Sequence, residues 1–211
     1  KYLIEAIKSI SKFIKINDLV IIESTSPVGT TDFLQNKIIE LSGLHQNDFK
    51  IAYCPERVLP GQIIKELVSN DRIVGGVNKE STELAKKFYS KFIHGKIFET
   101  DAKTAELVKL SENSYRDINI AFANELSMVC DEYKIDTNEL IKLSNCHPRV
   151  NILQPGCGVG GHCIAVDPWF IAGDLPESTL LIQTARKVNL NKEKWLLKKI
   201  LDKYYSVSKE L

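Results

Sequence analysis

The sequence has little of what marks a membrane, secreted or nucleic-acid-binding protein. No apolar run approaches the ~20 residues that a membrane-spanning helix needs, and the first residues do not resemble a signal peptide. The five cysteines are an odd number without the spacing of a disulfide framework, so we expect free thiols in a reducing cytoplasm. A formal net charge of +1, with lysines scattered among acidic residues, gives no support for nucleic acid or an anionic membrane as partner.

What remains is the composition of an ordinary globular protein. The 211 residues are enough for one or two domains with a sizeable core. The hydrophobic share of 44% and the charged share of 26% are typical of soluble proteins. The chain begins with Lys1 and not with methionine, so we expect the natural protein to start earlier.

The first hundred residues alternate between short apolar strands and amphipathic helices. The predicted strands are Leu19–Ile22, Phe49–Tyr53, Arg72–Val74 and Ile97–Phe98, and the predicted helices follow the first strand and cover about Ser81 to Phe92. This alternation predicts an α/β fold with a parallel, doubly wound sheet. Ligands of such sheets bind beyond the carboxyl ends of the strands, where Ser24–Ser26 and Pro55–Arg57 stand.

The second half is predicted to be mainly helical. Residues 104–133 carry apolar side chains at helical spacing: Val108, Tyr115, Ile118, Phe122, Leu126 and Val129. Asp101 is expected to cap this helix and Asp136 the next one. Another helix is predicted over Gln183–Tyr204. We therefore divide the chain into an α/β part, residues 1–100, and a helical part, residues 101–211.

The segment of residues 155–167, Pro-Gly-Cys-Gly-Val-Gly-Gly-His-Cys-Ile-Ala-Val-Asp, carries the strongest functional signature. Its four glycines within residues 156–161 let a polar ligand lie directly against backbone N–H groups. Cys163 follows at the edge of the loop, where a thiol can attack a bound ligand, and Asp167 adds a carboxylate. Together these residue types predict an active site.

Three other interpretations of this segment stay open at this point. Gly156, Gly158 and Gly161 match the dinucleotide fingerprint G-x-G-x-x-G, but no apolar strand precedes them and Pro168 is expected to interrupt a following helix. A structural zinc site would lack paired ligand spacing; its candidate ligands are Cys146, His147, Cys157, His162 and Cys163. The third interpretation is a flexible loop with a buried, inert cysteine.

Lys109 and Asn113 stand at i and i+4 of the long predicted helix and therefore share one face. Taken alone, this spacing favours a solvated surface pair. The motifs elsewhere in the chain favour a functional role instead.

Four motifs in order resemble those of the NAD-dependent nucleotide-sugar 6-dehydrogenases, the UDP-glucose dehydrogenase superfamily. They are Ser24-Thr25-x-Pro-Val-Gly, Cys54-Pro55-Glu56-Arg57, Ala105-Glu106-Leu107-Val108-Lys109-x-x-x-Asn113 and Gly160-Gly161-His162-Cys163-x-x-x-Asp167. The resemblance spans about residues 18–190. Val166 and Pro60 stand where the glucose branch has a lysine and a second glutamate. The resemblance is therefore greater to the branch that oxidises UDP-N-acetyl-D-mannosamine, with UDP-N-acetylglucosamine and UDP-glucose as alternatives.

The resemblance implies that the sugar's C6 hydroxyl is oxidised to a carboxylate in two hydride transfers to NAD. It implies that Cys163 forms a thiohemiacetal and then a thioester, while Lys109 and Asn113 stabilise the C6 oxygen. Asp167 would be the general base, and no metal is needed. The implied catalytic residues are Cys163, Lys109, Asn113, Asp167, Glu56 and Thr25; the cofactor contacts are Ser24, Thr25 and Glu56; the substrate contacts are Gly156, Gly158, Gly160, Gly161, Arg149, Lys109 and Asn113. For Arg149, a structural salt bridge is an equal alternative.

The resemblance also implies how the chain is divided. Residues 1–100 would be the second half of an NAD-binding Rossmann-like domain whose N-terminal glycine-rich unit is missing. Residues 101–211 would be the helical central dimerisation domain with the start of a connecting helix, without the C-terminal UDP-binding domain. We expect a cytoplasmic homodimer, and a fragment that is inactive alone. A non-catalytic helical dimerisation module is the alternative from a different class.

Overall fold

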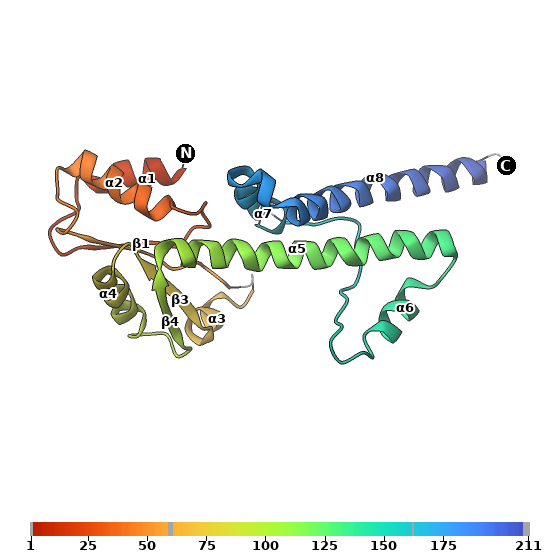
Figure 1. The fold of residues 1–211 in the computed structure, drawn as a ribbon, viewed down its shortest axis with the longest axis horizontal. Coiled ribbons are helices and arrows are strands. Elements are labelled where there is room, and N and C mark those ends of the chain that lie inside the picture. Colours follow the sequence, from red (N-terminus) through yellow and green to blue (C-terminus); the bar gives the residue numbers. More distant parts are fainter. Residues whose placement is uncertain (1, 59–60, 162, 209–211) are drawn as a thin grey trace. The chain divides into compact units, whose positions relative to one another are not determined.

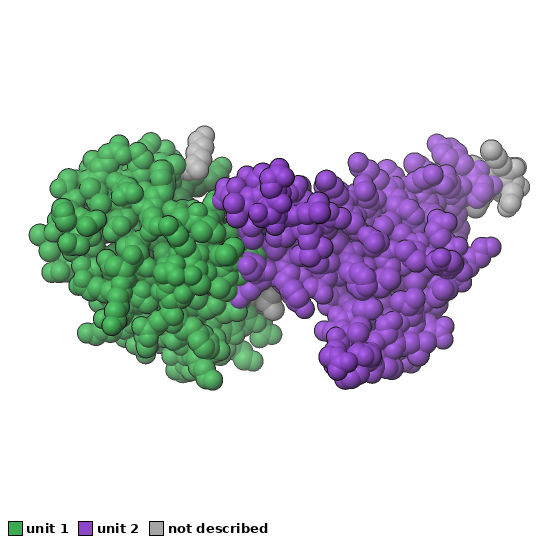
Figure 2. Space-filling view, in the orientation of Figure 1, with its two compact units in different colours: residues 1–110 green, residues 111–211 purple. Residues whose placement is uncertain are grey.

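The computed structural model describes residues 2–58, 61–161 and 163–208 (Figure 1). The chain divides into two compact units, residues 1–110 and residues 111–211, which Figure 2 shows in green and purple. The first unit is built on a sheet and the second is helical, and the division falls within one long helix. Within these described ranges, no helix is both long and apolar enough to cross a membrane.

The first unit contains four strands and four complete helices within its described residues. The strands are β1 (Leu19–Ile22), β2 (Lys50–Tyr53), β3 (Arg72–Gly76) and β4 (Ile97–Asp101), and they are hydrogen-bonded in that order. The helices are α1 (Tyr2–Ser11), α2 (Thr30–Ser42), α3 (Ile63–Ser69) and α4 (Lys79–Tyr89). The four predicted strands are confirmed, as are the helices that became α2 and α4. The residue pattern predicted neither α1 nor α3.

One strand pair departs from the predicted parallel sheet. β1 and β2 are parallel, as are β3 and β4, but β2 and β3 are antiparallel, with Tyr53 opposite Gly75. The described residues between β2 and β3 form only the short α3, and the chain enters β3 from the edge of the sheet at which it leaves β2. β3 must therefore run in the opposite direction. The sheet is mixed, and the carboxyl ends of β1 and β2 alone share the edge where the predicted ligand residues stand.

The core of the first unit is built around β2, all of whose residues are buried. Alternate residues of a strand point to opposite faces of the sheet. Ile51 and Tyr53 accordingly pack with Leu34 and Ile38 of α2, in one apolar cluster. The second cluster joins Ala52 and Val74 of the sheet, and Cys54 just after β2, to three apolar residues of α4 and the segment that follows it: Ala85, Tyr89 and Ile93.

Two glycines at the end of β3 stand where there is no room for a side chain. A Cβ atom added to Gly75 would lie 2.2 Å from the carbonyl oxygen of Asp101 on β4. A Cβ atom on Gly76 would lie 2.5 Å from the backbone nitrogen of Thr82 on α4. Close packing of backbone on backbone therefore requires glycine at both positions.

The second unit consists of helices and connecting loops. The helices are α5 (Ala102–Tyr133), which begins in the first unit, α6 (Thr137–Ser144), α7 (Cys163–Asp174) and α8 (Leu180–Ser208), with a 3₁₀ turn over Pro176–Ser178. Both predicted caps are confirmed. Asp101 accepts hydrogen bonds from the backbone and hydroxyl of Thr104 at 2.9 and 2.6 Å. Asp136 accepts from the backbone of Asn138 and Glu139 at 2.7 and 3.3 Å.

The expectation that Pro168 would interrupt a helix is wrong, because Pro168 lies inside α7. Proline lacks an N–H and so removes the hydrogen bond to the carbonyl of Ile164. The helix has only just begun at Cys163, so little regular structure precedes the missing bond. A dinucleotide fingerprint needs a strand directly before its glycines, and residues 151–161 contain no strand.

Candidate active site

The loops that follow β1 and β2 meet at one edge of the sheet, as the sequence predicted. The backbone N–H of Cys54 donates to the carbonyl of Ile22 at 2.9 Å, and that of Glu56 donates to the carbonyl of Glu23 at 3.3 Å. Ser24 on the first loop is exposed, and Thr25 is half-buried. The first unit therefore brings Ser24, Thr25 and Glu56 together on neighbouring segments.

Glu56 is held by a residue to which the sequence argument gave no role. The antiparallel pairing of β2 and β3, continued by three residues, places Glu56 opposite Arg72. The Arg72 guanidinium accordingly lies 3.4 Å from the Glu56 carboxylate, and Arg72 is 1% exposed. The same carboxylate oxygen accepts from the backbone of Arg57 and Val58. A charged residue at the start of a buried strand indicates that it has a partner. That the partner is Glu56 depends on the antiparallel direction of β3, which the sequence did not show.

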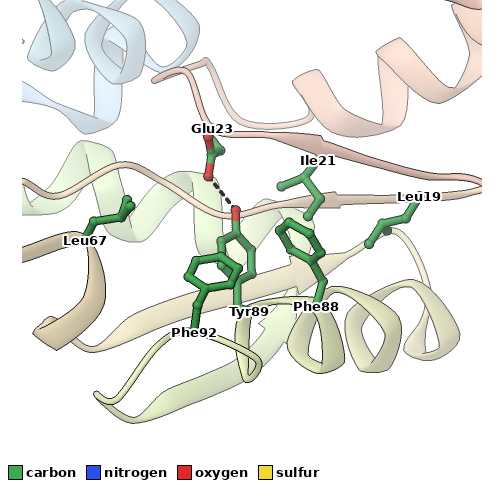
Figure 3. A pocket seen from close by; sticks show the side chains of 7 residues that line it. All are labelled: Leu19, Ile21, Glu23, Leu67, Phe88, Tyr89 and Phe92. Atoms are coloured by element: carbon green, nitrogen blue, oxygen red, sulfur yellow. Dashed lines mark hydrogen bonds between the residues drawn. The ribbon is translucent and has the colours of Figure 1, made fainter. Parts of the chain in front are cut away.

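A hollow of about 490 Å³ lies beside β1, with apolar walls from β1, α3 and α4 (Figure 3). The Tyr89 hydroxyl donates to Glu23 at 2.6 Å there and holds the residue that precedes Ser24. Burial raises the pKa of Tyr89 above its usual range and that of the nearby Cys54 thiol to about 11. Cys54 is also fully buried, so both its burial and its raised pKa argue against a role as nucleophile.

Glu106, which the sequence argument quoted within a motif without assigning it a role, is fully buried in the first unit. Its carboxylate accepts from the backbone of Gly29 at 2.6 Å, and from the backbone and hydroxyl of Thr31 at 2.7 and 2.6 Å. Burial raises the pKa of Glu106, and the bonds from Thr31 and Gly29 oppose that rise. Lys109, one turn further along α5, is half-buried.

The second unit brings together two predicted site residues that lie 54 positions apart. The Asn113 amide on α5 donates to the Asp167 carboxylate on α7 at 2.5 Å, and the two residues are 5% and 4% exposed. Asn113 is therefore buried and not a solvated surface residue. Cys163 is the first residue of α7, four positions before Asp167, and it is exposed. It is thus not the buried, inert cysteine of the simple-loop interpretation.

The glycine loop is attached to the helices at its start and open at its end. The backbone of Gly156 donates to the buried Asn124 of α5 at 2.9 Å. A Cβ atom on Gly158 would lie 2.5 Å from the Glu193 carboxylate of α8, which is the end of a flexible, exposed side chain. Around Gly160 and Gly161, an added Cβ would meet no protein atom within 4 Å. This end of the loop offers bare backbone to a ligand.

Asn124 belongs to a buried polar network between α5 and α8 that the sequence argument missed. Its amide donates to Asn189 at 2.9 Å, and Asn189 donates to Asp117 at 2.8 Å. Arg186 donates to the same Asp117 oxygen at 2.6 Å. The spacing of apolar residues showed an apolar face on α5. It gave no sign that polar residues on another face of this helix are buried against α8.

The remaining predicted residues lie apart from this network. Arg149 is exposed and forms no ion pair within the described ranges. No three His, Cys, Asp or Glu side chains cluster closely enough to hold a metal ion in the described part of the chain. His162, one candidate zinc ligand, and Pro60 lie outside the described residues.

The sequence matches two domains of one protein family. Residues 1–93 match the NAD binding domain, and residues 103–191 the central domain, of the UDP-glucose/GDP-mannose dehydrogenase family. The UDP-N-acetyl-D-mannosamine dehydrogenase of Campylobacter jejuni is 56% identical over 210 residues, 96% of this chain and 52% of that protein. The NDP-N-acetyl-D-galactosaminuronic acid dehydrogenase of Ralstonia solanacearum is 53% identical over 207 residues, 94% of this chain and 49% of that protein. The chain spans about half the length of the curated relatives it matches.

Solved structures give the same result for the fold. The UDP-D-ManNAc dehydrogenase of Pyrococcus horikoshii superposes with a TM-score of 0.91 at 45% identity, over 97% of this chain and 50% of that one. A UDP-glucose dehydrogenase from Pyrobaculum islandicum superposes with a TM-score of 0.83 at 21% identity, over 98% of this chain and 49% of that one. The predicted fold class, a Rossmann-like α/β sheet followed by helices, is confirmed.

Proposed function

Because this chain belongs to the UDP-glucose/GDP-mannose dehydrogenase family, we propose that it provides catalytic residues of an NAD-dependent UDP-N-acetyl-D-mannosamine 6-dehydrogenase. The observation that carries the proposal is the buried contact between Asn113 and Asp167, next to an exposed Cys163 on the same helix as Asp167. It joins two of the four motifs at one place. The choice of sugar is supported by relatives such as the UDP-N-acetyl-D-mannosamine dehydrogenase of Campylobacter jejuni.

In the proposed first oxidation, C6 of the sugar loses a hydride and its hydroxyl loses a proton. NAD supplies the hydride acceptor when it is bound. Ser24 would contact it, and Thr25 and Glu56 would border the nicotinamide and the hydrolytic water. Asp167 accepts the proton, since the Asn113 amide fixes the direction of its carboxylate. Lys109 stabilises the negative charge that develops on the C6 oxygen, and the product is an aldehyde.

In the proposed second oxidation, the Cys163 thiolate adds to C6 and forms a carbon–sulfur bond. Loss of a second hydride, for which a second molecule of NAD would be the acceptor, converts this thiohemiacetal into a thioester. Water then breaks the carbon–sulfur bond, which releases the acid and restores the thiol. The position of Cys163 supports this role, because it is exposed and the N-terminus of a helix stabilises nearby anions.

The glycine loop and Arg149 are the proposed contacts to the nucleotide sugar. Gly156 attaches the loop to α5, while Gly160 and Gly161 leave backbone groups open to a polar ligand. Arg149 is exposed and suits a phosphate group.

We also propose that the protein is a cytoplasmic homodimer that pairs through α5. Tyr115, Phe122 and Val129 repeat every seven residues on this helix, and they are 69%, 53% and 43% exposed. An apolar face of this length is costly to leave in water, and a second copy of the same face would cover it.

Oxidation assays of the full-length protein test the function. We expect NADH with UDP-N-acetyl-D-mannosamine, two molecules for each sugar acid, and slower turnover of UDP-N-acetylglucosamine and UDP-glucose. The 211-residue chain alone is expected to be inactive, since it covers about half the length of its relatives. Faster turnover of another sugar would change the substrate. No turnover with any of the three would support a non-catalytic dimerisation module instead.

A further inference from the structure

The loop between β1 and α2, residues 23–29, is fixed at both of its ends. At its start, the Tyr89 hydroxyl donates to the Glu23 carboxylate at 2.6 Å (Figure 3). At its end, the backbone of Gly29 donates to Glu106 at 2.6 Å. The loop carries Ser24 and Thr25, so these two contacts contribute to where both residues stand. The bond from the Glu56 backbone to Glu23 and a bond from the Ser26 hydroxyl to the Ser24 carbonyl at 2.8 Å add to them.

Glu106 supplies a helix cap that α2 lacks in its own sequence. The N-cap residue of α2 is Gly29, in the left-handed conformation with φ 87°, and it has no side chain to cap the helix. The Glu106 carboxylate caps α2 instead, although Glu106 is more than 70 residues away in the sequence. It accepts hydrogen bonds from the backbone of Gly29 and Thr31 and from the Thr31 hydroxyl. Helix N-termini favour a carboxylate at this position.

The location of Glu106 on α5 links this cap to the chemistry. Glu106 and Lys109 are at i and i+3, so they occupy adjacent turns on one side of the helix. A fully buried carboxylate among neutral donors is costly to keep charged, and burial indeed raises its pKa. An uncharged residue would be cheaper if the position served packing alone.

We propose that Glu106 is a positioning residue for hydride transfer, which holds the loop of Thr25 in register with Lys109. This inference rests on the proposed function, in which Thr25 borders the nicotinamide and Lys109 faces the C6 oxygen. Hydride donor and acceptor must be placed within a fraction of an ångström, and a displacement of about 1 Å can cost ~10² in rate. The geometry of the cap would thereby affect kcat, while the affinity for the nucleotide sugar would not depend on the cap.

The test uses Glu106→Gln in the full-length enzyme. Glutamine has nearly the same shape, but its NH₂ group can only donate. It would therefore face one of the N–H or O–H groups whose hydrogen bonds the carboxylate now accepts. We expect hydride transfer in a single turnover to slow by about 10- to 100-fold, with little change in the KM for the UDP sugar. With substrate deuterated at C6, the isotope effect on kcat should increase, because the hydride step becomes more rate-limiting. Glu125→Gln, an exposed carboxylate on the same helix, is the matched control and should change none of these.

Thr31→Val is the second variant, in case Glu106→Gln does not fold. It removes the hydroxyl bond to Glu106 and keeps the backbone bond, so we expect the same kinetic pattern at a smaller size. A wild-type enzyme that forms no NADH would defeat the proposed function before any variant is compared. With an active wild type, variants that lose activity only in proportion to their folded fraction, with an unchanged isotope effect, would overturn the positioning role. Full-rate hydride transfer in either variant would overturn it as well.

Discussion

At the scale of single residues, the five cysteines differ in their surroundings. Cys54 and Cys130 are buried, while Cys146, Cys157 and Cys163 are exposed. We expect limiting iodoacetamide at neutral pH to label Cys163 first, because it begins a helix whose N-terminus stabilises anions. Cys54, with a pKa raised to about 11 by burial, should stay unlabelled. Mass-spectrometric mapping reads all five sites, with Cys146 and Cys157 as exposed controls. Equal labelling of the three exposed thiols would count against an activated nucleophile.

Substitutions at Cys163 and Lys109 should affect different steps of the reaction. In full-length Cys163→Ser, the first oxidation should survive and acid formation should stop, because a hydroxyl is a far poorer nucleophile than a thiolate. In Lys109→Ala, both oxidations should slow by about 10²–10³, because both pass through negative charge on the C6 oxygen. Rapid-quench analysis of aldehyde, acid and covalent adduct separates these outcomes. Acid production at the full rate by Cys163→Ser would show that the cysteine is structural.

Sequence motifs named the candidate site residues, but they did not name the partners of those residues. Asn113 and Asp167 were both named from the sequence, but nothing in the spacing showed that they touch. Glu106 stands in a quoted motif, yet its role depends on where α5 passes the start of α2. Contacts of this kind come from tertiary packing, to which local residue patterns are blind.

At the scale of elements, periodicity predicted the long or strongly apolar segments. β1 and β2 are apolar runs, and α5 repeats its apolar residues over many turns. The short α3 has too few residues to show a period. The helix of α7 was obscured by Pro168, whose cost is small near a helix start. The direction of β3 depends on the edge at which the chain enters the sheet, and the sequence of β3 does not indicate that edge.

The buried ion pair between α5 and α8 allows a stability prediction. Asp117 and Arg186 are 1% and 5% exposed at the side chain and lie 2.6 Å apart. Arg186→Leu should destabilise the second unit by about 3–5 kcal/mol, because it leaves a buried charge unpaired. The double variant with Asp117→Leu should recover part of this loss. Urea unfolding can be followed by tryptophan fluorescence, since both tryptophans, Trp169 and Trp195, lie in this unit.

A matched control comes from the same two helices. Lys199 of α8 and Asp131 of α5 form an exposed ion pair, and such pairs contribute little in water. Lys199→Leu should therefore leave the unfolding midpoint nearly unchanged. An Arg186→Leu midpoint equal to that of Lys199→Leu would mean that the buried pair adds nothing to stability.

At the scale of the whole molecule, the exposed face of α5 predicts self-association. Phe122 lies between Tyr115 and Val129 on this face and is 53% exposed. Phe122→Glu would place two like charges at the centre of the paired surface, so we expect it to convert the dimer to a monomer in light scattering at micromolar concentration. Glu125→Gln on the same helix should leave the mass unchanged. A wild-type protein that is already monomeric under these conditions would refute the pairing.

The glycines of this chain imply two kinds of mutational intolerance that a population of variants would separate. An alanine at Gly75 would drive its Cβ into the backbone of Asp101, so such variants should be lost from the folded pool. An alanine at Gly160 meets no protein atom, so the folded protein should persist while turnover falls. A saturation library scored once for cellular abundance and once for sugar-acid production would show the difference. In an evolving lineage, substitutions at Gly75 would be removed because the protein no longer folds. Substitutions at Gly160 would be removed only by selection for the sugar acid.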